Sequence, residues 1–417
     1  MSRFCAVLAV VALFAAGCGG DDDEGATTAT TGGGQAGAQS VTVEVDGKVG
    51  DLPMGAIAYF PEAVTLHPGD TVRFHSNHTG EPHTVTFGTV VDESMKAFNQ
   101  LPDEIKNADE PADPSKLTDE QKAQVAEVEA LDEALPTLLP EGAGPGDANQ
   151  LSANPCYAAT APADTEKACP TAQQPAFDGR LAVYNSGFLP KGEVFEVELA
   201  DDLAPGTYNY FCLLHREGMT GTITVVPEGQ KAQTAEEVQQ AAEKGLEETA
   251  AQLRPQFEQL EETPADTPIA GQPPAEGEEE KGSGFLAPLS PEKLSVPVGT
   301  SVTWSVFGPH TVSFNAPEDA RGIMVRALDG TWHANQKATA PAGGPGAPPP
   351  PEGEPAPDAK PILVDGGTFD GSGFKSSGLI LSFGPPGYQY KVTFTKAGTY
   401  KVHCLIHPDM EGTVKVT

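Results

Sequence analysis

Two short stretches of the chain gather side chains that can bind a transition metal. HCLIHPDM, residues 403–410, holds a cysteine, two histidines and a methionine, and FCLLHREGM, residues 211–219, holds a looser version of this set. The whole chain has only six Cys, nine His and six Met, so this clustering needs a chemical reason. Thiolate, imidazole and thioether groups together suit copper, whereas the thioether argues against zinc.

Alternation along YKVHC puts Cys404 on one face of its expected strand and His403 on the other, so each stretch needs one more histidine, from a distant part of the chain, to complete a copper site. A trigonal His₂Cys arrangement with a weak axial Met is the site that tunes copper for electron transfer. The segments EPHTVTF and GPHTVSF each offer a histidine at the mouth of an expected strand. The two predicted ligand sets are His83, Cys212, His215 and Met219, and His310, Cys404, His407 and Met410.

The ligands occur twice because the chain contains an internal repeat. Phe177 precedes Cys212 by 35 positions, Phe369 precedes Cys404 by 35, and a GTY triplet follows the Phe by 29 in both copies. Segments such as TVRF, SVTW and GTVKV alternate apolar with polar residues, and HPGD, PVGT and KAGT supply turns. This pattern predicts an all-β chain of two Greek-key sandwiches.

The segments outside the repeats set the expected domain boundaries. We predict a first β domain over 41–228 with an insertion over 92–176, a linker over 229–284, and a second β domain over 285–417 with an insertion over 316–366. The first insertion has a helical pattern that opens on a capping box, Thr118 with Gln121. The Pro/Gly-rich second insertion reads as a flexible loop.

The linker begins with a helical pattern and ends in a stretch that reads as disordered. Its apolar stripe would pack on a sandwich or, as an alternative, form a coiled-coil surface for a partner. The stripe consists of Val238, Ala242, Leu246, Ala250, Leu253 and Phe257.

The first 18 residues predict export. MSRFCAVLAVVALFAAGC has one Arg before an apolar run too short to span a bilayer, and its end, AAGC, resembles a bacterial lipobox. In that motif the cysteine, here Cys18, becomes the lipid-modified first residue; ordinary cleavage is the alternative. Residues 19–40 then read as a flexible tether. We expect a protein lipid-anchored on the outer side of the cytoplasmic membrane, with Cys156 and Cys169 paired in a disulfide.

The charge of the chain narrows the classes of partner. There are 59 acidic residues against 25 basic ones, a formal net charge of −34. A nucleic-acid partner is excluded because the phosphate backbone would be repelled. The acidic surface favours solubility and could steer a basic redox partner protein, whose identity the sequence does not reveal.

In these motifs both repeats resemble the cupredoxins, the plastocyanin- and azurin-like blue copper proteins. The first copy is similar to the plastocyanin pattern, and CLIHPDM looks more like amicyanin. The resemblance implies β-sandwiches with one type 1 copper each, two per chain, that cycle between Cu(I) and Cu(II) as one-electron carriers. Members often have Asn after the early His; here Thr84 and Thr311 stand there, so we expect altered hydrogen bonding near the metal.

Three other interpretations stay open. Copper nitrite reductases and two-domain multicopper oxidases also pair such domains, and in them a His beside the copper Cys relays electrons to a further copper. His403 stands at that position, although an exposed histidine on the outer face of its strand is the plainer interpretation. Copper delivery or storage is the second alternative, and a fold that has lost its copper is the third.

Overall fold

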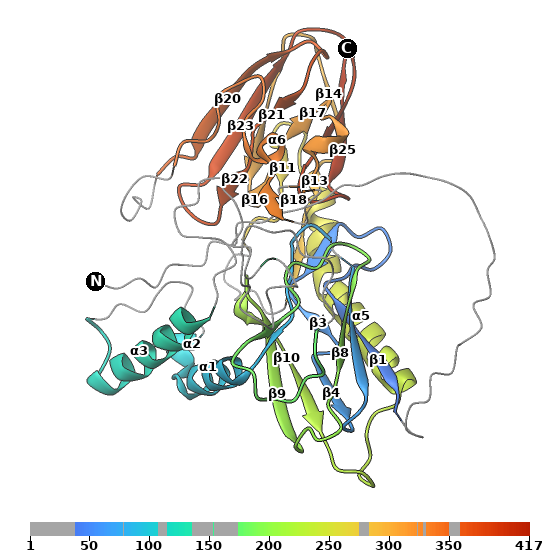
Figure 1. The fold of residues 1–417 in the computed structure, drawn as a ribbon. Helices are drawn as coiled ribbons and strands as arrows, with labels where there is room; N and C mark the ends of the chain where they lie inside the picture. The colour runs from blue at the N-terminus through green and yellow to red at the C-terminus, as the bar shows by residue number, and fades with distance from the viewer. Residues whose placement is uncertain are drawn as a thin grey trace, which may run out of the picture.

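The computed structural model describes residues 38–77, 79–106, 115–135, 153, 174–274, 283–322, 324–327, 331–349 and 359–417. Figure 1 shows two β-sandwiches, one above the other, with helices beside the lower one. The prediction of an all-β chain built from two sandwiches is confirmed.

The first sandwich consists of a four-stranded and a five-stranded sheet. Parallel pairing of β1 with β5 and of β4 with β10, beside antiparallel neighbours, produces the crossed connections of a Greek key. The four-stranded sheet has the order β3 (Tyr59–Phe60), β1 (Ser40–Val45), β5 (Thr71–Ser76), β8 (Val194–Glu198). The other sheet has the order β4 (Ala63–Leu66), β10 (Arg216–Val225), β9 (Gly206–Cys212), β6 (Thr86–Phe87), β7 (Tyr184–Asn185).

The second sandwich repeats this strand order and adds one strand at an edge. Its first sheet has the order β13 (Leu289–Ser290), β11 (Ile269–Ala270), β15 (Ser301–Val306), β23 (Tyr388–Phe394), β20 (Ile362–Phe369). Its second sheet has the order β14 (Lys293–Val296), β25 (Glu411–Val416), β24 (Gly398–His403), β17 (Ser313–Phe314), β21 (Lys375–Ser376). Strand β11 comes from the range assigned to the linker, and it pairs with β15 as β1 pairs with β5.

Three two-stranded ribbons complete the sheets of the described residues. They are β2 (Met54–Ala56) with β12 (Gly284–Leu286), β16 (Gly308–His310) with β22 (Ile380–Ser382), and β18 (Met324–Arg326) with β19 (Trp332–Ala334). The first of these ribbons joins the two halves of the chain, because β2 belongs to the first repeat and β12 precedes the second.

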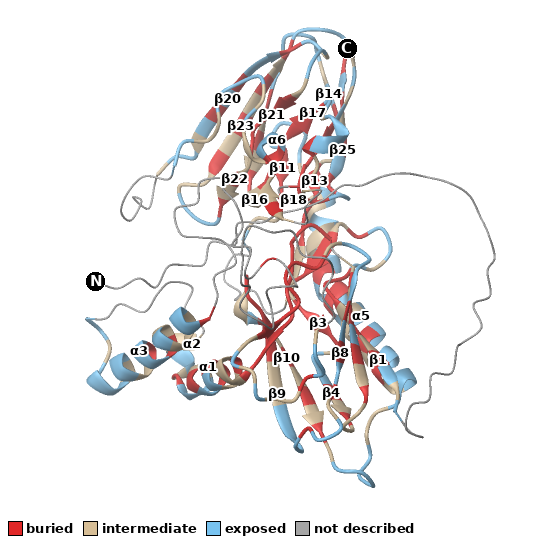
Figure 2. Ribbon diagram, in the orientation of Figure 1, coloured by how far each residue is buried: buried red, intermediate tan, exposed pale blue. Residues whose placement is uncertain are grey.

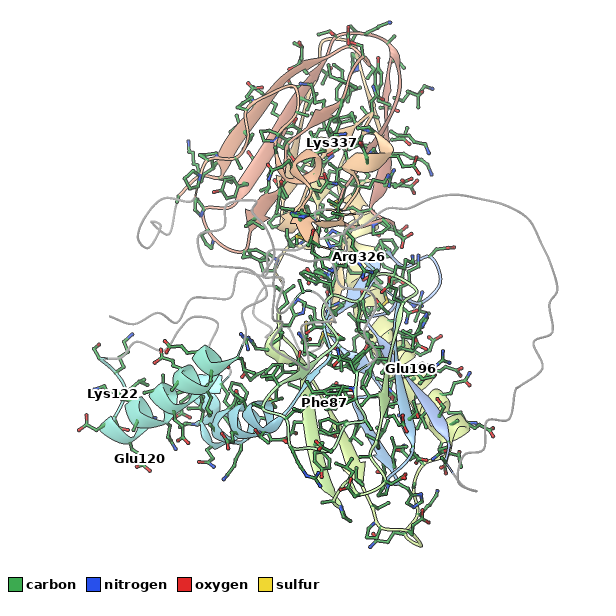
Figure 3. The ribbon with its side chains drawn as sticks, viewed as in Figure 1. Phe87, Glu120, Lys122, Glu196, Arg326 and Lys337 are labelled. Carbon is green, nitrogen blue, oxygen red and sulfur yellow. The ribbon has the colours of Figure 1, made fainter. Side chains whose placement is uncertain are left out.

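Each sandwich is filled by the inward-facing residues of its alternating strands, drawn red in Figure 2. In the first sandwich Tyr210 packs edge-on against Tyr59 and Phe74, with ring centroids 4.9 and 5.1 Å apart. Figure 3 labels Phe87 in the same interior, and its ring centroid lies 5.8 Å from that of Phe74. Burial of each such ring contributes about 1.5–3 kcal/mol, so these strands hold their ends, where the candidate ligands lie, firmly in place.

The first insertion forms helices that cover one side of the first sandwich. They are α1 (Thr89–Gln100), α2 (Asp103–Lys106) and α3 (Asp119–Ala134). The predicted capping box at α3 is confirmed, because Thr118 accepts from the Gln121 backbone N–H and Gln121 accepts from the Thr118 N–H. Val91 and Met95 of α1 are buried against the sandwich core.

The predicted linker helix is α5 (Ala235–Glu261), and it packs on the first sandwich rather than standing free. Val238, Ala242, Ala250 and Leu253 of the predicted stripe are buried, and Leu246 and Phe257 pack beside them. The stripe therefore contacts β1, β2, β3 and β12, which favours the sandwich-packing interpretation over the coiled-coil alternative.

The second insertion holds short elements that its weak sequence pattern does not reveal, and part of its Pro/Gly-rich stretch lies outside the described residues. It contains a short 3₁₀ helix η2 (Glu318–Ala320), the β18–β19 ribbon, α6 (Gln336–Thr339) and the start of β20. Ala320, Met324, Trp332 and Ala338 are buried in the second core. Scattered apolar anchors hold this segment without any regular period, which is why its pattern is weak.

Several predictions at the N-terminus and in the first insertion lie outside the described residues. These concern the signal peptide, the tether up to residue 37, Cys18, and the Cys156–Cys169 disulfide. Among the helices that the structure describes, none combines the length and the apolar character needed to span a bilayer.

Candidate metal centres

The structure brings together the cysteine and both histidines of each predicted ligand set. One cluster joins His83, Cys212 and His215, and the other joins His310, Cys404 and His407. Within each cluster one ligand atom from every residue lies within 4.8 Å of the others. Both clusters lie where the cysteine strands, β9 and β24, end.

Strand ends place these residues. Cys212 ends β9 and Cys404 directly follows β24, so each thiol emerges where a central strand stops. His83 forms an isolated bridge with Leu189, whose N–H donates to the His83 carbonyl at 3.0 Å. His310 ends β16 and pairs with Ile380. The early histidine of each set is thus held by backbone pairing with a segment other than the one that bears the cysteine.

The two methionines are buried shortly after the second histidine, Met219 in β10 and Met410 just before β25. Met219 and Met410 are each 1% exposed. The Cys404 N–H donates to the Met410 carbonyl at 3.0 Å, and the Met410 N–H donates to the His407 carbonyl at 3.1 Å. The first domain has one more residue between its second histidine and its methionine than the second domain has. An irregularity in β10, where Arg216 has a φ of 49°, accommodates it.

The imidazole rings turn the same nitrogen inward at both sites. His310 Nδ1 lies 3.0 Å from His407 Nδ1, and Cys404 Sγ lies 3.6 Å from the same His407 atom. In the first cluster, His83 Nδ1 and His215 Nδ1 are buried and have no hydrogen-bond partner. Buried, convergent and unsatisfied imidazole nitrogens beside a thiol fit the donor set that copper requires.

The threonine after each early histidine holds the cysteine in place. The backbone N–H groups of Thr84 and Thr311 point at Cys212 Sγ and Cys404 Sγ, each 3.4 Å away. Their hydroxyl oxygens accept from the N–H groups of Leu213 and Leu405, at 2.8 and 2.7 Å. The threonine that stands in place of Asn therefore contacts the cysteine loop in two ways, through its backbone N–H and through its hydroxyl oxygen.

Two buried carboxylates stand beside the histidines of the first cluster. Glu81 Oε2 lies 2.9 Å from His215 Nε2, and Asp46 Oδ2 lies 3.8 Å from His83 Nε2. Asp46 and Glu81 are 1% and 5% exposed. Such carboxylates fix the ring orientation of a metal-binding histidine and raise its basicity.

These carboxylates make the first cluster ionic in the absence of metal. Burial alone would lower the pKa of His215, but the Cys212 thiolate and Glu81 outweigh it and raise that pKa to about 10. Burial alone would raise the pKa of Cys212, but the positive charges of His215 and His83 close to its sulfur hold it well below the usual value. Both shifts favour a thiolate and an imidazolium at this cluster.

The second cluster is neutral by comparison. Burial lowers the pKa of His310 to about 3, despite a hydrogen bond with the Phe307 carbonyl. Burial also raises the pKa of Cys404, against the opposing N–H groups that point at its sulfur. Two sites with the same ligand residues thus have different charge states.

The expected exposure of His403 is wrong, because this side chain is only 6% exposed. The face of β24 opposite Cys404 is covered by the second insertion, where Gly322 donates to the Leu405 carbonyl at 2.7 Å. Arg321 of that insertion pairs with Glu411 at 3.5 Å. His403 Nε2 is buried without a hydrogen-bond partner among the described residues, and burial lowers the pKa of His403 to about 4.

The other candidate histidines stand apart from both clusters. His67 contacts the Gln230 carbonyl, His75 pairs with Glu44, and His333 with Thr331. His78 lies outside the described residues. Asp46 and Glu81, in contrast, are residues that the motifs missed. Glu81 lies two residues before His83, and this spacing is a signal in the sequence that could have identified it. Asp46 reaches the site only through the pairing of β1 with β5.

Comparison with known proteins gives matches among solved structures alone. No family model matches the chain, and no curated protein matches it. Auracyanin A, a "blue" copper protein from Chloroflexus aurantiacus, is 19% identical, with 45% of this chain and 98% of that one covered, at a TM-score of 0.21. Amicyanin from Paracoccus versutus is 17% identical over 37% of this chain and 86% of its own, at 0.16.

A purple cupredoxin from Nitrosopumilus maritimus is 19% identical, with 36% of this chain and 98% of that one covered, at a TM-score of 0.16. Scores this low support no argument about function. The fold and the sites therefore rest on the strand order and the side-chain geometry: two Greek-key β-sandwiches, each with a His/Cys/His cluster.

Proposed function

We propose that the chain is an electron-transfer protein that holds one copper ion at each of its two His/Cys/His clusters. The observation that carries this is the duplicated, buried convergence of two imidazoles and one thiol at the ends of equivalent strands. Bound copper supplies one-electron chemistry between Cu(I) and Cu(II). Buried Met219 and Met410 are the proposed axial ligands.

The residues around the ligands support this role over bond-making chemistry. Both cysteines are at most 1% exposed, and the side chains of His215 and His407 are 6% and 2% exposed, so little of either cluster is open to solvent. Backbone N–H groups aimed at both sulfurs stabilise a thiolate in a fixed place. A rigid ligand cage suits a carrier, because little needs to move when an electron arrives.

We further propose that Cys18 carries a lipid and that the protein works on the outer side of the cytoplasmic membrane with a redox partner protein. The apolar start, the AAGC sequence and the acidic tether support this. A Cys18→Ser variant should leave the membrane fraction and appear in the soluble one. A variant that stays membrane-bound contradicts the lipid anchor.

Copper stoichiometry, visible absorption and electron paramagnetic resonance (EPR) of the purified protein test the function. We expect two coppers per chain and strong colour when oxidised; Cys212→Ser and Cys404→Ser should each lose one copper and its share of the colour. A copper-loaded protein without colour would contradict the proposal. A third copper with nitrite or oxygen turnover would support the enzyme alternative, and rapidly reversible copper without Cu(II) colour would support delivery.

A further inference from the structure

One short segment of the first domain contacts a ligand histidine of each site. Glu81 Oε2 lies 2.9 Å from His215 Nε2 of the first cluster. Its neighbour Gly80 lies flat against His407 of the second cluster, where a Cβ on Gly80 would stand 2.3 Å from His407 Cδ2. The two candidate metal centres therefore face each other across the domain boundary, with residues 80–81 between them.

The contacts around this segment hold the two domains in that arrangement. Strand β12 pairs with β2, and Phe285 of β12 packs edge-on against the His407 ring, with centroids 5.8 Å apart. Three further contacts cross the boundary, and Figure 3 labels Arg326 where the two sandwiches meet. They are Lys48–Asp409 at 2.6 Å, Arg326–Glu193 at 3.9 Å and Phe188–Trp332 with ring centroids 5.4 Å apart.

This arrangement covers the ring edges of both second histidines. The His215 side chain is 6% exposed and His407 is 2% exposed. An external protein cannot reach either ring directly while the domains are docked. Each ring is instead next to residues 80–81, so the nearest redox group to each site is the other site.

The two sites carry different residues at one structurally equivalent position. Asn77 donates to the Val45 carbonyl at 3.0 Å, and Phe307 donates to the Ala270 carbonyl at 2.9 Å, in matching strand pairs. The next residues along β1 and β11 are Asp46 and Gly271, both with positive φ, 63° and 91°. Gly271 is needed, because a Cβ there would stand 2.4 Å from His310 Nε2.

Asp46 is held as a buried anion. Its Oδ1 accepts from the Gly47 and Ala56 N–H groups at 2.6 and 2.7 Å, and its Oδ2 accepts from the Thr79 N–H and hydroxyl at 2.6 and 2.8 Å. Burial would raise the pKa of this carboxyl, but His83 and the backbone donors hold it below the ordinary value. His310, in the equivalent place, has the neutral Phe307 carbonyl as its partner instead of a carboxylate.

A fixed negative charge beside a metal favours the more positive oxidation state. The first site has Asp46 at His83 and Glu81 at His215, whereas no carboxylate of the described residues contacts His310; Glu81 also acts on His407, but less than on His215. We propose that Asp46 and Glu81 give the first site the lower reduction potential, and that the segment 80–81 passes single electrons from it to the second site. This rests on the proposed function.

The step balances without any further reactant. The one electron that leaves the first site, oxidised from Cu(I) to Cu(II), is the one that reduces the second from Cu(II) to Cu(I). No bond forms or breaks, and no proton needs to move. The donor to the first site and the acceptor from the second remain separate partner proteins.

Potentiometric titration followed by EPR tests the order of the potentials. Cys404→Ser isolates the first site and Cys212→Ser the second, and we expect the first to be the lower. In full-length protein, Asp46→Asn or Glu81→Gln should raise the first-site potential by at least a tenfold change in the Cu(I)/Cu(II) ratio, about 59 mV. The second site should move less than the first.

Asp70→Asn is the matched control, because Asp70 is a carboxylate of the same sandwich, also 1% exposed, at the opposite end of β5. It should leave both potentials unchanged. Two bound coppers with equal or reversed potentials, or no shift in either carboxylate variant, would overturn the inference while leaving the carrier function intact. Failure to bind copper would instead overturn the proposed function.

Rapid partial reduction tests the route. Less than one electron per chain should give a phase, independent of protein concentration, in which the first site reoxidises as the second is reduced. Gly80→Ala should slow it, because the added methyl displaces His407. Gly192→Ala is the control, since Gly192 also has positive φ, 78°, but a Cβ there meets nothing within 4 Å. A phase that depends on concentration contradicts the route.

Discussion

Thr311 contacts the cysteine loop of the second site in two ways. Its backbone N–H points at Cys404 Sγ from 3.4 Å, and its hydroxyl oxygen accepts from the Leu405 N–H at 2.7 Å. Thr84 contacts the first loop in the same manner. A threonine directly after the early histidine thus sets where the sulfur lies relative to the imidazoles.

Thr311→Val should therefore destabilise the second domain. Valine keeps the shape but leaves the buried Leu405 N–H without its acceptor, which costs about 1–3 kcal/mol. We expect a lower free energy of unfolding, measured with urea by fluorescence. The chain has only two Trp residues, Trp304 inside the second domain and Trp332 where that domain packs on Phe188 of the first, so tryptophan emission reports the second domain and its docking.

Thr311→Ser should retain most of the stability, because it keeps the hydroxyl. Thr393→Val is the control; its hydroxyl contacts only Ser301 at an exposed position, so a change within about 0.5 kcal/mol is expected. Equal losses in the two valine variants would contradict the role assigned to Thr311.

The two cysteines should differ in ionisation when the metal is removed. The pKa of Cys212 is held well below its usual value by His215, whereas burial raises the pKa of Cys404. At pH 7 the metal-free protein should contain the Cys212 thiolate and the Cys404 thiol. Thiolate absorbance near the far-ultraviolet edge measures this directly.

Cys212→Ser should lower that absorbance at pH 7, and Cys404→Ser should leave it unchanged until the solution is alkaline. Subtracting each variant from the unaltered chain cancels the other cysteines. Glu81→Gln should shift the Cys212 titration upward, because His215 loses the carboxylate that helps to keep it protonated. Identical titrations for the two cysteines would refute the charge difference between the sites.

The ligand positions and the two sandwiches could be predicted because both depend on local pattern. A Cys-x-x-His loop between two strands brings its residues together whatever surrounds it, and period-two alternation with a repeated spacing identifies the strands. The capping box at Thr118 and the stripe on α5 are equally local. These features need no knowledge of distant contacts.

The remaining features depend on tertiary contacts that no local pattern records. Alternation in YKVHC separates two faces of β24, but it does not say that an irregular insertion covers the second face and buries His403. Strand β11 has only two residues, in a Pro-rich stretch, and exists because β15 and β13 flank it. Asp46 reaches His83 only through strand pairing.

The buried histidines of the second domain should make it sensitive to acid in the metal-free state. Burial lowers the pKa of His403 from 6.5 to about 4 and that of His310 from 6.5 to about 3. At a pH between the folded-state pKa and 6.5, each of these histidines binds a proton in the unfolded chain but not in the folded domain. Stability is therefore complete above pH 6.5 and falls as the pH falls toward 4.

Tryptophan-detected urea unfolding across this pH range measures the effect. His403→Gln should flatten the loss between pH 6.5 and 4 by up to about 3 kcal/mol, since each pKa unit is worth about 1.4 kcal/mol. His67→Gln, in the other sandwich, should leave the slope of the second domain as it was. An unchanged slope in His403→Gln would show that this side chain is not held neutral.

The docking of α5 should control how firmly the two domains are held together. Ala250 is fully buried in a cluster with Leu52, Met54 and Leu286, which joins the helix to both strands of the β2–β12 ribbon. Ala250→Asp would place an unpaired charge there, at a cost of several kcal/mol. We expect a lower free energy of unfolding and, in small-angle X-ray scattering, a larger radius of gyration as the ribbon separates.

Ala251→Asp makes the same chemical change one residue further along, at an exposed position of the same helix. It should alter stability by no more than about 0.5 kcal/mol and leave the scattering profile unchanged. Because β12 also carries Phe285 against His407, undocking in Ala250→Asp should slow electron exchange between the sites as well. A compact Ala250→Asp variant with unaltered exchange would show that α5 does not hold the two sites in register.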